Sequence, residues 1–198
     1  MATQNVLWCV RSTLLPGLAL LLASCGHVPL MSMVTLSRVD FASTDPALLR
    51  AAIKLPQVIE PRLNGAALRV AVKLADGRDM GEEFKLSETT DERDVLALHA
   101  ELDPGTRVFA YRIEPGELER LKAFRRTALA QKQGQRAGLE ISVKPDACRV
   151  GTLPPEPLLM TSYIKTSETN RYVTLARDVD LRTLAAGRDA AAAIPACR

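Results

Sequence analysis

Aromatic residues and histidine are both scarce in this chain. Phe, Trp and Tyr together make up 4% of its 198 residues, and there are only two histidines. Few aromatic rings argue against a groove that binds carbohydrate by stacking, and no Cys/His cluster has the spacing of a zinc site. The formal net charge is +3, so the near-balanced surface gives no reason to expect nucleic acid as a partner.

The usual signatures of catalysis are missing as well. The sequence has no G-x-S-x-G nucleophile elbow and no glycine-rich phosphate loop, which leaves acyl transfer and nucleotide binding without support. Two acidic clusters, Glu82-Glu83 and residues 91–94, could hold a hard cation. However, neighbouring residues of a strand face opposite ways, and the second cluster lacks the ligand spacing of a calcium loop. We therefore interpret both clusters as solvated surface and expect no metal site, no cofactor and no enzymatic activity.

One histidine lies in a stretch that alternates like a strand. In residues 95–102 a period of two places Leu96, Leu98 and Leu102 inward, and His99 beside Glu101 outward. A solvated strand position is the simpler interpretation of His99. A functional His–Glu pair is the alternative.

The N-terminus has the proportions of a secretory leader. Arg11 is the only charge before an apolar run from Leu14 to Ala23, and small residues follow. Ten residues rise only about 15 Å as a helix, against a hydrocarbon core of roughly 30 Å, so the run is too short to span a membrane. The sequence thus predicts a cleaved signal peptide over residues 1–24.

The next residue suggests how the mature protein is held in place. Leu22-Ala23-Ser24-Cys25 resembles the lipobox of bacterial lipoproteins, and this resemblance implies lipidation of Cys25. Gly26, where an inner-membrane lipoprotein often has aspartate, implies passage to the outer membrane, with the protein facing the periplasm. In that family the cysteine thiol receives two acyl chains and the new N-terminus a third, which is more than stable membrane anchoring requires. A cleaved but unlipidated leader, with Cys25 accidental, is the alternative.

Removing 24 of the 198 residues leaves 174, enough for one domain with its own core. We expect a short tether over residues 25–31 and a single globular domain over residues 32–198. Cys148 and Cys197 are the remaining pair outside the leader and the lipidation site, and an even pair in an oxidising compartment predicts a disulfide. Free, reactive thiols are the alternative.

Alternating strands dominate the rest of the chain. Leu68 to Leu74 alternates clearly, Asp76-Gly77 marks a turn and Phe84-Lys85-Leu86 resumes the pattern, which predicts a hairpin. The fold class is therefore mainly β or α+β: an antiparallel β-sandwich-like domain or an open sheet, with one long helix packed on it. The other expected elements are a helix from Thr44 to Pro56, a hairpin over 95–113, the long helix over 114–135, and strands over 139–143, 158–165 and 172–175.

The long helix carries acidic residues near its start and basic residues toward its end. Arg125 and Arg126 belong to the basic part and could touch anionic lipid headgroups. A simpler explanation is that the charges complement the helix dipole, with Glu117–Arg120 and Glu119–Lys122 as i,i+3 pairs.

The segment Leu158 to Leu181 resembles C-terminal regions of uncharacterised bacterial lipoproteins, and this resemblance implies no function. We interpret the segment as a hairpin with alternating charge on its polar face. The leading hypothesis for the whole chain is a non-enzymatic envelope lipoprotein, an interaction or accessory module with an envelope protein as partner. A periplasmic binding protein for an apolar small molecule and an enzyme without a recognisable motif are the alternatives.

Overall fold

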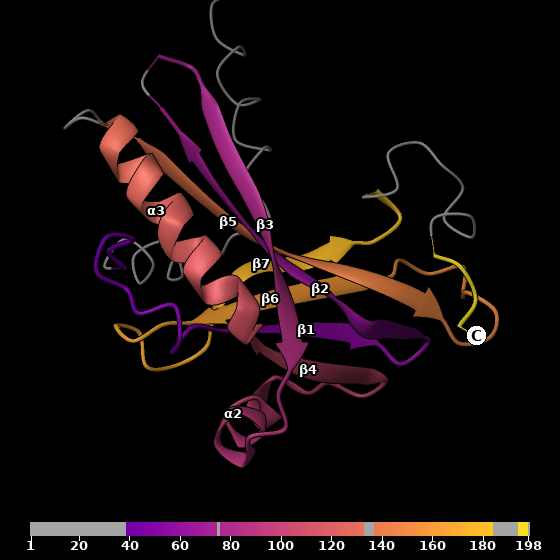
Figure 1. The fold of residues 1–198 in the computed structure, drawn as a ribbon. Coiled ribbons are helices and arrows are strands. Elements are labelled where there is room, and N and C mark those ends of the chain that lie inside the picture. The colour runs from indigo at the N-terminus through magenta and orange to yellow at the C-terminus, as the bar shows by residue number, and fades with distance from the viewer. Residues whose placement is uncertain (1–38, 75, 133–136, 184–193, 198) are drawn as a thin grey trace, which may run out of the picture.

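A computed structural model describes residues 39–74, 76–132, 137–183 and 194–197 (Figure 1). The predicted leader, Cys25 and the tether lie outside these residues. The described chain is built around one antiparallel sheet of seven strands in the order β5-β2-β3-β4-β1-β6-β7. The strands are β1 (Arg50–Pro56), β2 (Ile59–Lys73), β3 (Asp79–Glu88), β4 (Thr106–Ile113), β5 (Gly138–Arg149), β6 (Leu159–Lys165) and β7 (Val173–Asp180).

The predicted hairpin is the β2–β3 pair. Leu68 lies opposite Phe84, and Ala66 opposite Leu86, with all four side chains buried. The next pair along, Arg69 opposite Glu83, is on the outer side, so the period of two separates the core from the solvent. At the turn Gly77 has a φ of 85°, a left-handed conformation that glycine adopts without strain.

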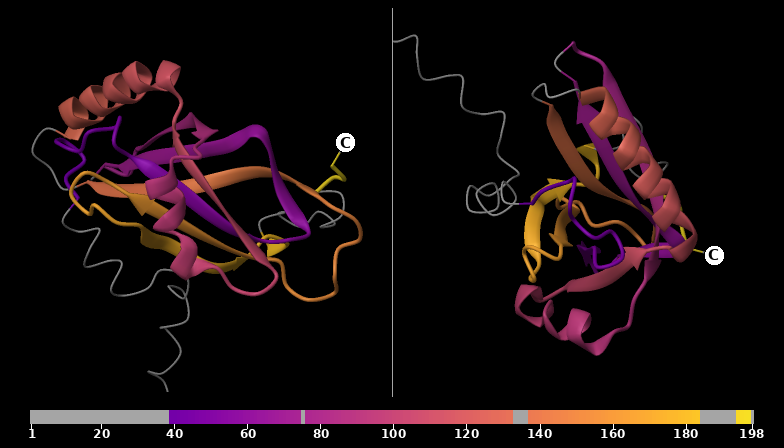
Figure 2. Two further views of the ribbon diagram at one scale, coloured as in Figure 1. Left: turned by 90° about the horizontal axis from the view of Figure 1, so that it is seen from below. Right: turned by 60° about the vertical axis from the view of Figure 1, so that its left-hand side comes forward.

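The sheet is strongly curled, so that it is nearly closed (Figure 2). A bend in β2 contributes, because its pairing with β5 shifts register between Pro61 and Ala66. Gly65 occupies this bend, where a Cβ atom would lie 2.6 Å from the carbonyl oxygen of Asp146. The close approach of β5 therefore requires glycine. Strands β5 and β7 form the two edges of the sheet and are not paired with each other.

The long helix is present as α3 (Leu118–Lys132), after a short 3-10 turn over Pro115–Glu117. Leu121, Phe124 and Ala128 are its buried residues and face the core. The Phe124 ring meets the Phe84 ring edge to face, with 5.9 Å between centroids, which ties the helix to β3. Both predicted i,i+3 ion pairs, Glu117–Arg120 and Glu119–Lys122, are formed.

The mainly β, antiparallel class is confirmed, but the finer expectation needs correction. The strands form one nearly closed sheet, neither a two-sheet sandwich nor an open sheet. There are also two α-helices among the described residues, because α2 (Glu92–Leu96) accompanies α3.

Two element predictions were wrong. The expected helix over 44–56 is a series of turns followed by β1, because Ala51, Ile53 and Leu55 alternate into the core while β4 and β6 pair on either side. The expected strand over 95–102 is instead the end of α2 and a 3-10 helix, η1 (His99–Glu101). In both segments tertiary pairing or packing overrides an ambiguous short apolar pattern.

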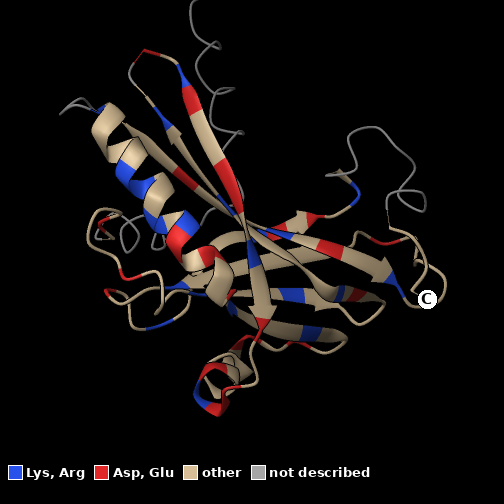
Figure 3. Cartoon of the chain, in the orientation of Figure 1, with Lys and Arg blue, Asp and Glu red and all other residues tan. Residues whose placement is uncertain are grey.

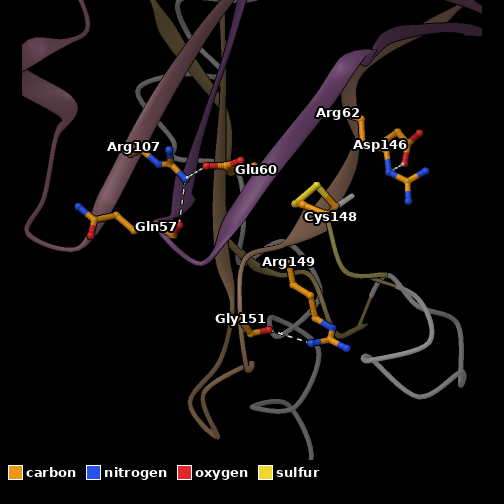
Figure 4. The surroundings of a disulfide bond; sticks show 9 residues. Gln57, Glu60, Arg62, Arg107, Asp146, Cys148, Arg149 and Gly151 are labelled. Atoms are coloured by element: carbon orange, nitrogen blue, oxygen red, sulfur yellow. Dashed lines mark hydrogen bonds and ion pairs between the residues drawn. A yellow bond between two sulfur atoms is a disulfide. The ribbon is translucent and has the colours of Figure 1, made fainter.

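The C-terminal tail lies beside the end of β5 (Figure 4). The Sγ atoms of Cys148 and Cys197 are 2.02 Å apart, as a disulfide requires. The backbone of Arg149 donates to the Pro195 carbonyl at 2.8 Å and accepts from the Cys197 N–H at 3.0 Å. The tail thus covers this end of the β5 edge, which would otherwise leave its backbone groups unpaired.

Candidate functional site

The most unusual feature of the fold is the connection between β3 and β4. These strands are antiparallel neighbours, and such neighbours are commonly joined by two to five residues. Here residues 89–105 separate them and fold into α2 and η1, below β4 in Figure 1. We call residues 89–105 the crossover. Its length exceeds what the turn needs, so its structure calls for another explanation.

The crossover packs on the outer face of three strands. Ala110 of β4, Ala52 of β1 and Tyr163 of β6 are aligned in one row across the sheet. Leu98 of the crossover is 3% exposed and belongs to the same apolar cluster. Two alanines in the row leave room for the larger leucine, so the outer face of the sheet has a small second core.

A row of cations lies next to this apolar row. Arg112 of β4, Arg50 of β1 and Lys165 of β6 are aligned across the same three strands. Neighbouring strands are about 4.8 Å apart, so like charges in such a row repel one another. Asp94 of α2 is 4% exposed and compensates them, with its carboxylate 2.9 Å from Arg50 Nε and 2.9 Å from Lys165 Nζ.

Two further contacts hold the other end of the crossover. The Tyr163 hydroxyl donates to Glu101 Oε2 at 2.9 Å. Burial, followed by this bond and the Glu101 charge, raises the pKa of Tyr163 above its ordinary value. Lys54 Nζ lies 2.6 Å from Asp103 Oδ2, and this hydrogen bond lowers the pKa of Asp103. Asp94, Glu101 and Asp103 therefore fasten the crossover to β1 and β6 at three points.

A capping residue starts α2. The Asp91 side chain accepts a hydrogen bond from the Arg93 backbone N–H at 3.0 Å, and this bond lowers the pKa of Asp91. The acidic residues Glu92 and Asp94 follow in the first turn, where the helix dipole favours them. Asp94 itself is buried and pairs with Arg50 and Lys165, so our interpretation of residues 91–94 as solvated surface was wrong for this residue. The capping pattern was the signal in the sequence that indicates a helix start.

Three large apolar side chains are exposed on the crossover. Leu96, Leu102 and Val95 are 57%, 45% and 41% exposed, although large apolar side chains are more often buried. We call these three residues the ridge. Beside the ridge lies a shallow groove of about 70 Å³, lined by Val95, Leu98, His99, Leu102, Val108 and Ala110.

Acidic side chains border the ridge. Glu88, Asp91, Glu92 and Asp103 are exposed in and next to the crossover, and Arg93 is the exposed cation among them. Figure 3 shows this mixture, dominated by acidic residues, around α2. An apolar centre with a charged rim is the usual anatomy of a protein interface.

In the described part of the chain, the residues with catalytic potential that the sequence offers are engaged elsewhere or lie apart. His99 is exposed, and Glu101 accepts from Tyr163 instead of forming the alternative His–Glu pair. Ser162 and Lys165 have S-x-x-K spacing, but they lie in β6, where residues three apart face opposite sides. Lys165 is engaged by Asp94 on the outer face. Among the described residues, no group of His, Cys, Asp and Glu could hold a metal ion.

The structure separates the two arginines of the expected membrane contact. Arg125 is half-buried and donates from Nη1 to the Thr44 carbonyl at 2.6 Å, so it holds the chain before β1 against α3. Arg126 is exposed on the same helix.

The other acidic cluster has cationic partners. Glu82 lies 3.4 Å from Arg120, and Glu83 pairs with Lys144. These contacts are on the surface, as expected for Glu82-Glu83, and each contributes little to stability.

Little space for a ligand remains inside the curled sheet. Buried side chains from several strands and loops fill it, including Phe84, Leu68, Ile53 and Leu158. An apolar cavity of about 40 Å³ remains between α3, β2, β5 and β6. Sites for small organic ligands usually measure roughly 300–1,000 Å³. The described interior therefore gives no support to the alternative of an apolar small-molecule carrier.

No protein-family model, curated protein or solved structure matches this chain. None of the helices in the described part of the chain is long and apolar enough to cross a membrane.

Proposed function

We propose that this protein is a non-enzymatic lipoprotein of the cell envelope, anchored through Cys25 and facing the periplasm, that binds another protein through the ridge. The observation that carries the proposal is the attached, apolar crossover. A connection of 17 residues replaces a short turn, is fastened by Asp94, Glu101 and Asp103, and leaves Val95, Leu96 and Leu102 exposed.

The attachment of the crossover to the sheet favours binding because it reduces the conformational entropy that is lost on association. A mobile loop loses conformational entropy when a partner orders it, which weakens the complex. In the crossover, Leu98 and the buried Asp94 already fix the backbone that carries the ridge. The apolar side chains are thus presented in place before the partner arrives. Such pre-organisation raises affinity because less conformational entropy is lost on binding.

The charge around the ridge indicates the chemistry of the partner. Acidic residues outnumber basic ones at the rim, so a complementary surface would have an apolar projection surrounded by Lys or Arg. Association would then be faster at low ionic strength, because exposed charges are screened over about 10 Å at 0.1 M salt.

Site-specific photocrosslinking in intact cells tests this function. A photoreactive amino acid replaces Leu96 in the ridge, and in a matched control it replaces Leu63, which is 91% exposed in the β2 bend. The proposal expects a discrete protein adduct from position 96 and none of the same mass from position 63. It also expects that Leu102→Asp, on the surface of the same ridge, abolishes the adduct.

The same crosslinking assay tests the acidic rim of the ridge and the lipid anchor at Cys25. Glu92→Arg should weaken the adduct from position 96, and Cys25→Ala should abolish it and release the protein from the membrane fraction. Failure to obtain an adduct at position 96 while position 63 gives one would contradict the ridge. Membrane association that persists after Cys25→Ala would contradict the anchor.

A further inference from the structure

A second surface lies on the opposite side of the molecule from the crossover. In Figure 1 and in the right-hand view of Figure 2, the C-terminal end of α3 and the helix α2 lie at opposite ends of the structure. An open groove of about 200 Å³ runs there between α3 and the start of β5. Its lining is mostly apolar and includes Phe41, Val72, Ala128, Leu129 and Leu139.

The described chain begins at this groove. Val39, the first described residue, is part of its lining. Only 13 residues lie between Cys25 and Val39, and the chain that connects the two spans at most about 50 Å. The Arg125–Thr44 bond holds the following segment against α3. A lipid attached at Cys25 would therefore be connected to the described structure at this end of the molecule.

The rim of the groove combines apolar and basic side chains. Leu129 and Leu139 are 37% and 41% exposed on its two sides. Arg126 and Lys132 flank Leu129 at intervals of three along α3, and neither forms an ion pair with another described residue. Apolar residues together with unpaired cations are the combination that favours an interface with anionic lipid.

The acidic residues nearby are already engaged. Asp40 lines the groove, and its carboxylate accepts hydrogen bonds from the Ala42 N–H at 3.0 Å and the Ser43 hydroxyl at 2.9 Å. Glu140 of β5 pairs with Lys73 at 3.1 Å. The Ala42 hydrogen bond lowers the pKa of Asp40 most and the nearby Lys132 charge contributes, yet neither Asp40 nor Glu140 forms an ion pair with Arg126 or Lys132.

We propose that this groove end rests on the bilayer, with Leu129 and Leu139 reaching the acyl boundary and with Arg126 and Lys132 contacting anionic headgroups. The inference depends on the lipid anchor of the proposed function. It replaces Arg125, which is engaged with Thr44, by Lys132 in the expected membrane contact. It also orients the molecule, because the ridge then points away from the membrane and toward the periplasmic space.

Tryptophan fluorescence can test the contact in the processed, lipidated protein. The single tryptophan of the chain is Trp8, in the predicted leader, so an introduced tryptophan would report alone. Leu139→Trp and Leu129→Trp place the probe on the groove rim, and Leu63→Trp is the matched exposed control. Vesicles of phosphatidylethanolamine and phosphatidylglycerol with brominated acyl chains quench a tryptophan that reaches the acyl boundary.

The rim probes should lose most of their emission in brominated vesicles, with a blue shift, whereas the Leu63→Trp emission should stay unchanged. Arg126→Glu with Lys132→Glu should largely restore the Leu139→Trp emission. Lys85→Glu with Arg62→Glu, an equal change of net charge at exposed positions elsewhere, should not.

The results separate this inference from the anchor. Protein that sediments with the vesicles but shows equal quenching at positions 63, 129 and 139, or none, overturns the groove contact alone. Protein that does not sediment with vesicles contradicts the anchor itself.

Discussion

Removing the carboxylate of Asp94 should destabilise the fold more than an ordinary surface charge would. In Asp94→Ala, Arg50 and Lys165 each lose a partner at 2.9 Å, and Arg112 remains beside them in the cation row. Breaking a fully buried ion pair costs about 3–5 kcal/mol. The two cations are 22% exposed, so water partly solvates them, and we expect a loss of about 2–3 kcal/mol. That loss changes the unfolding equilibrium by roughly a hundredfold.

Denaturant unfolding of Asp94→Ala, Lys165→Met and the double variant measures this effect. Lys165→Met in the Asp94→Ala background removes a charge that has lost its partner, so it should cost less there than in the wild type. The coupling energy should be about 1–3 kcal/mol. A loss below about 1 kcal/mol for Asp94→Ala, with no coupling, would refute the reasoning, because exposed ion pairs behave in that way.

Two further predictions concern the whole fold. Burial raises the pKa of all three tyrosines, Tyr111, Tyr163 and Tyr172. Near-ultraviolet titration of the native protein should therefore show no phenolate at pH values just above the ordinary pKa of about 10. After denaturation, all three side chains should titrate with the ordinary pKa. Stability should be intact below about pH 10 and fall as the pH rises toward the raised values, and native phenolate near pH 10 would contradict their burial. Cys148→Ala with Cys197→Ala should lower the free energy of unfolding by about 2–4 kcal/mol, because the disulfide spans 49 residues. Two free thiols in the denatured, unreduced mature chain would rule out the disulfide.

Local patterns predicted several elements well. The alternation from Leu68 to Leu74, with a turn at Asp76-Gly77, predicted the β2–β3 pair. The spacing of Leu121, Phe124 and Ala128 predicted α3. These segments are long, and each has one clearly apolar face, so neighbouring residues contain enough information to define them.

Short apolar segments were the ones that misled. Residues 51–55 fit a helix stripe or an alternating strand, and pairing with both β4 and β6 decides in favour of β1. Residues 95–102 alternate like a strand, yet Leu98 packs onto the alanines of two other strands and the segment is helical. Neither outcome could be read from the segment itself, because the deciding contacts come from distant parts of the chain.

The sequence by itself determined the antiparallel β class and the long helix, and it predicted the Cys148–Cys197 disulfide. The lipid anchor at Cys25 stays a prediction. Only the tertiary structure revealed how the crossover is attached to the sheet. Asp94 lies 44 residues from Arg50 and 71 from Lys165, and it contacts both because the β1–β6 register places Arg50 opposite Lys165. Composition and periodicity act over a few neighbouring residues, whereas the charge balance of that row depends on which strands lie side by side.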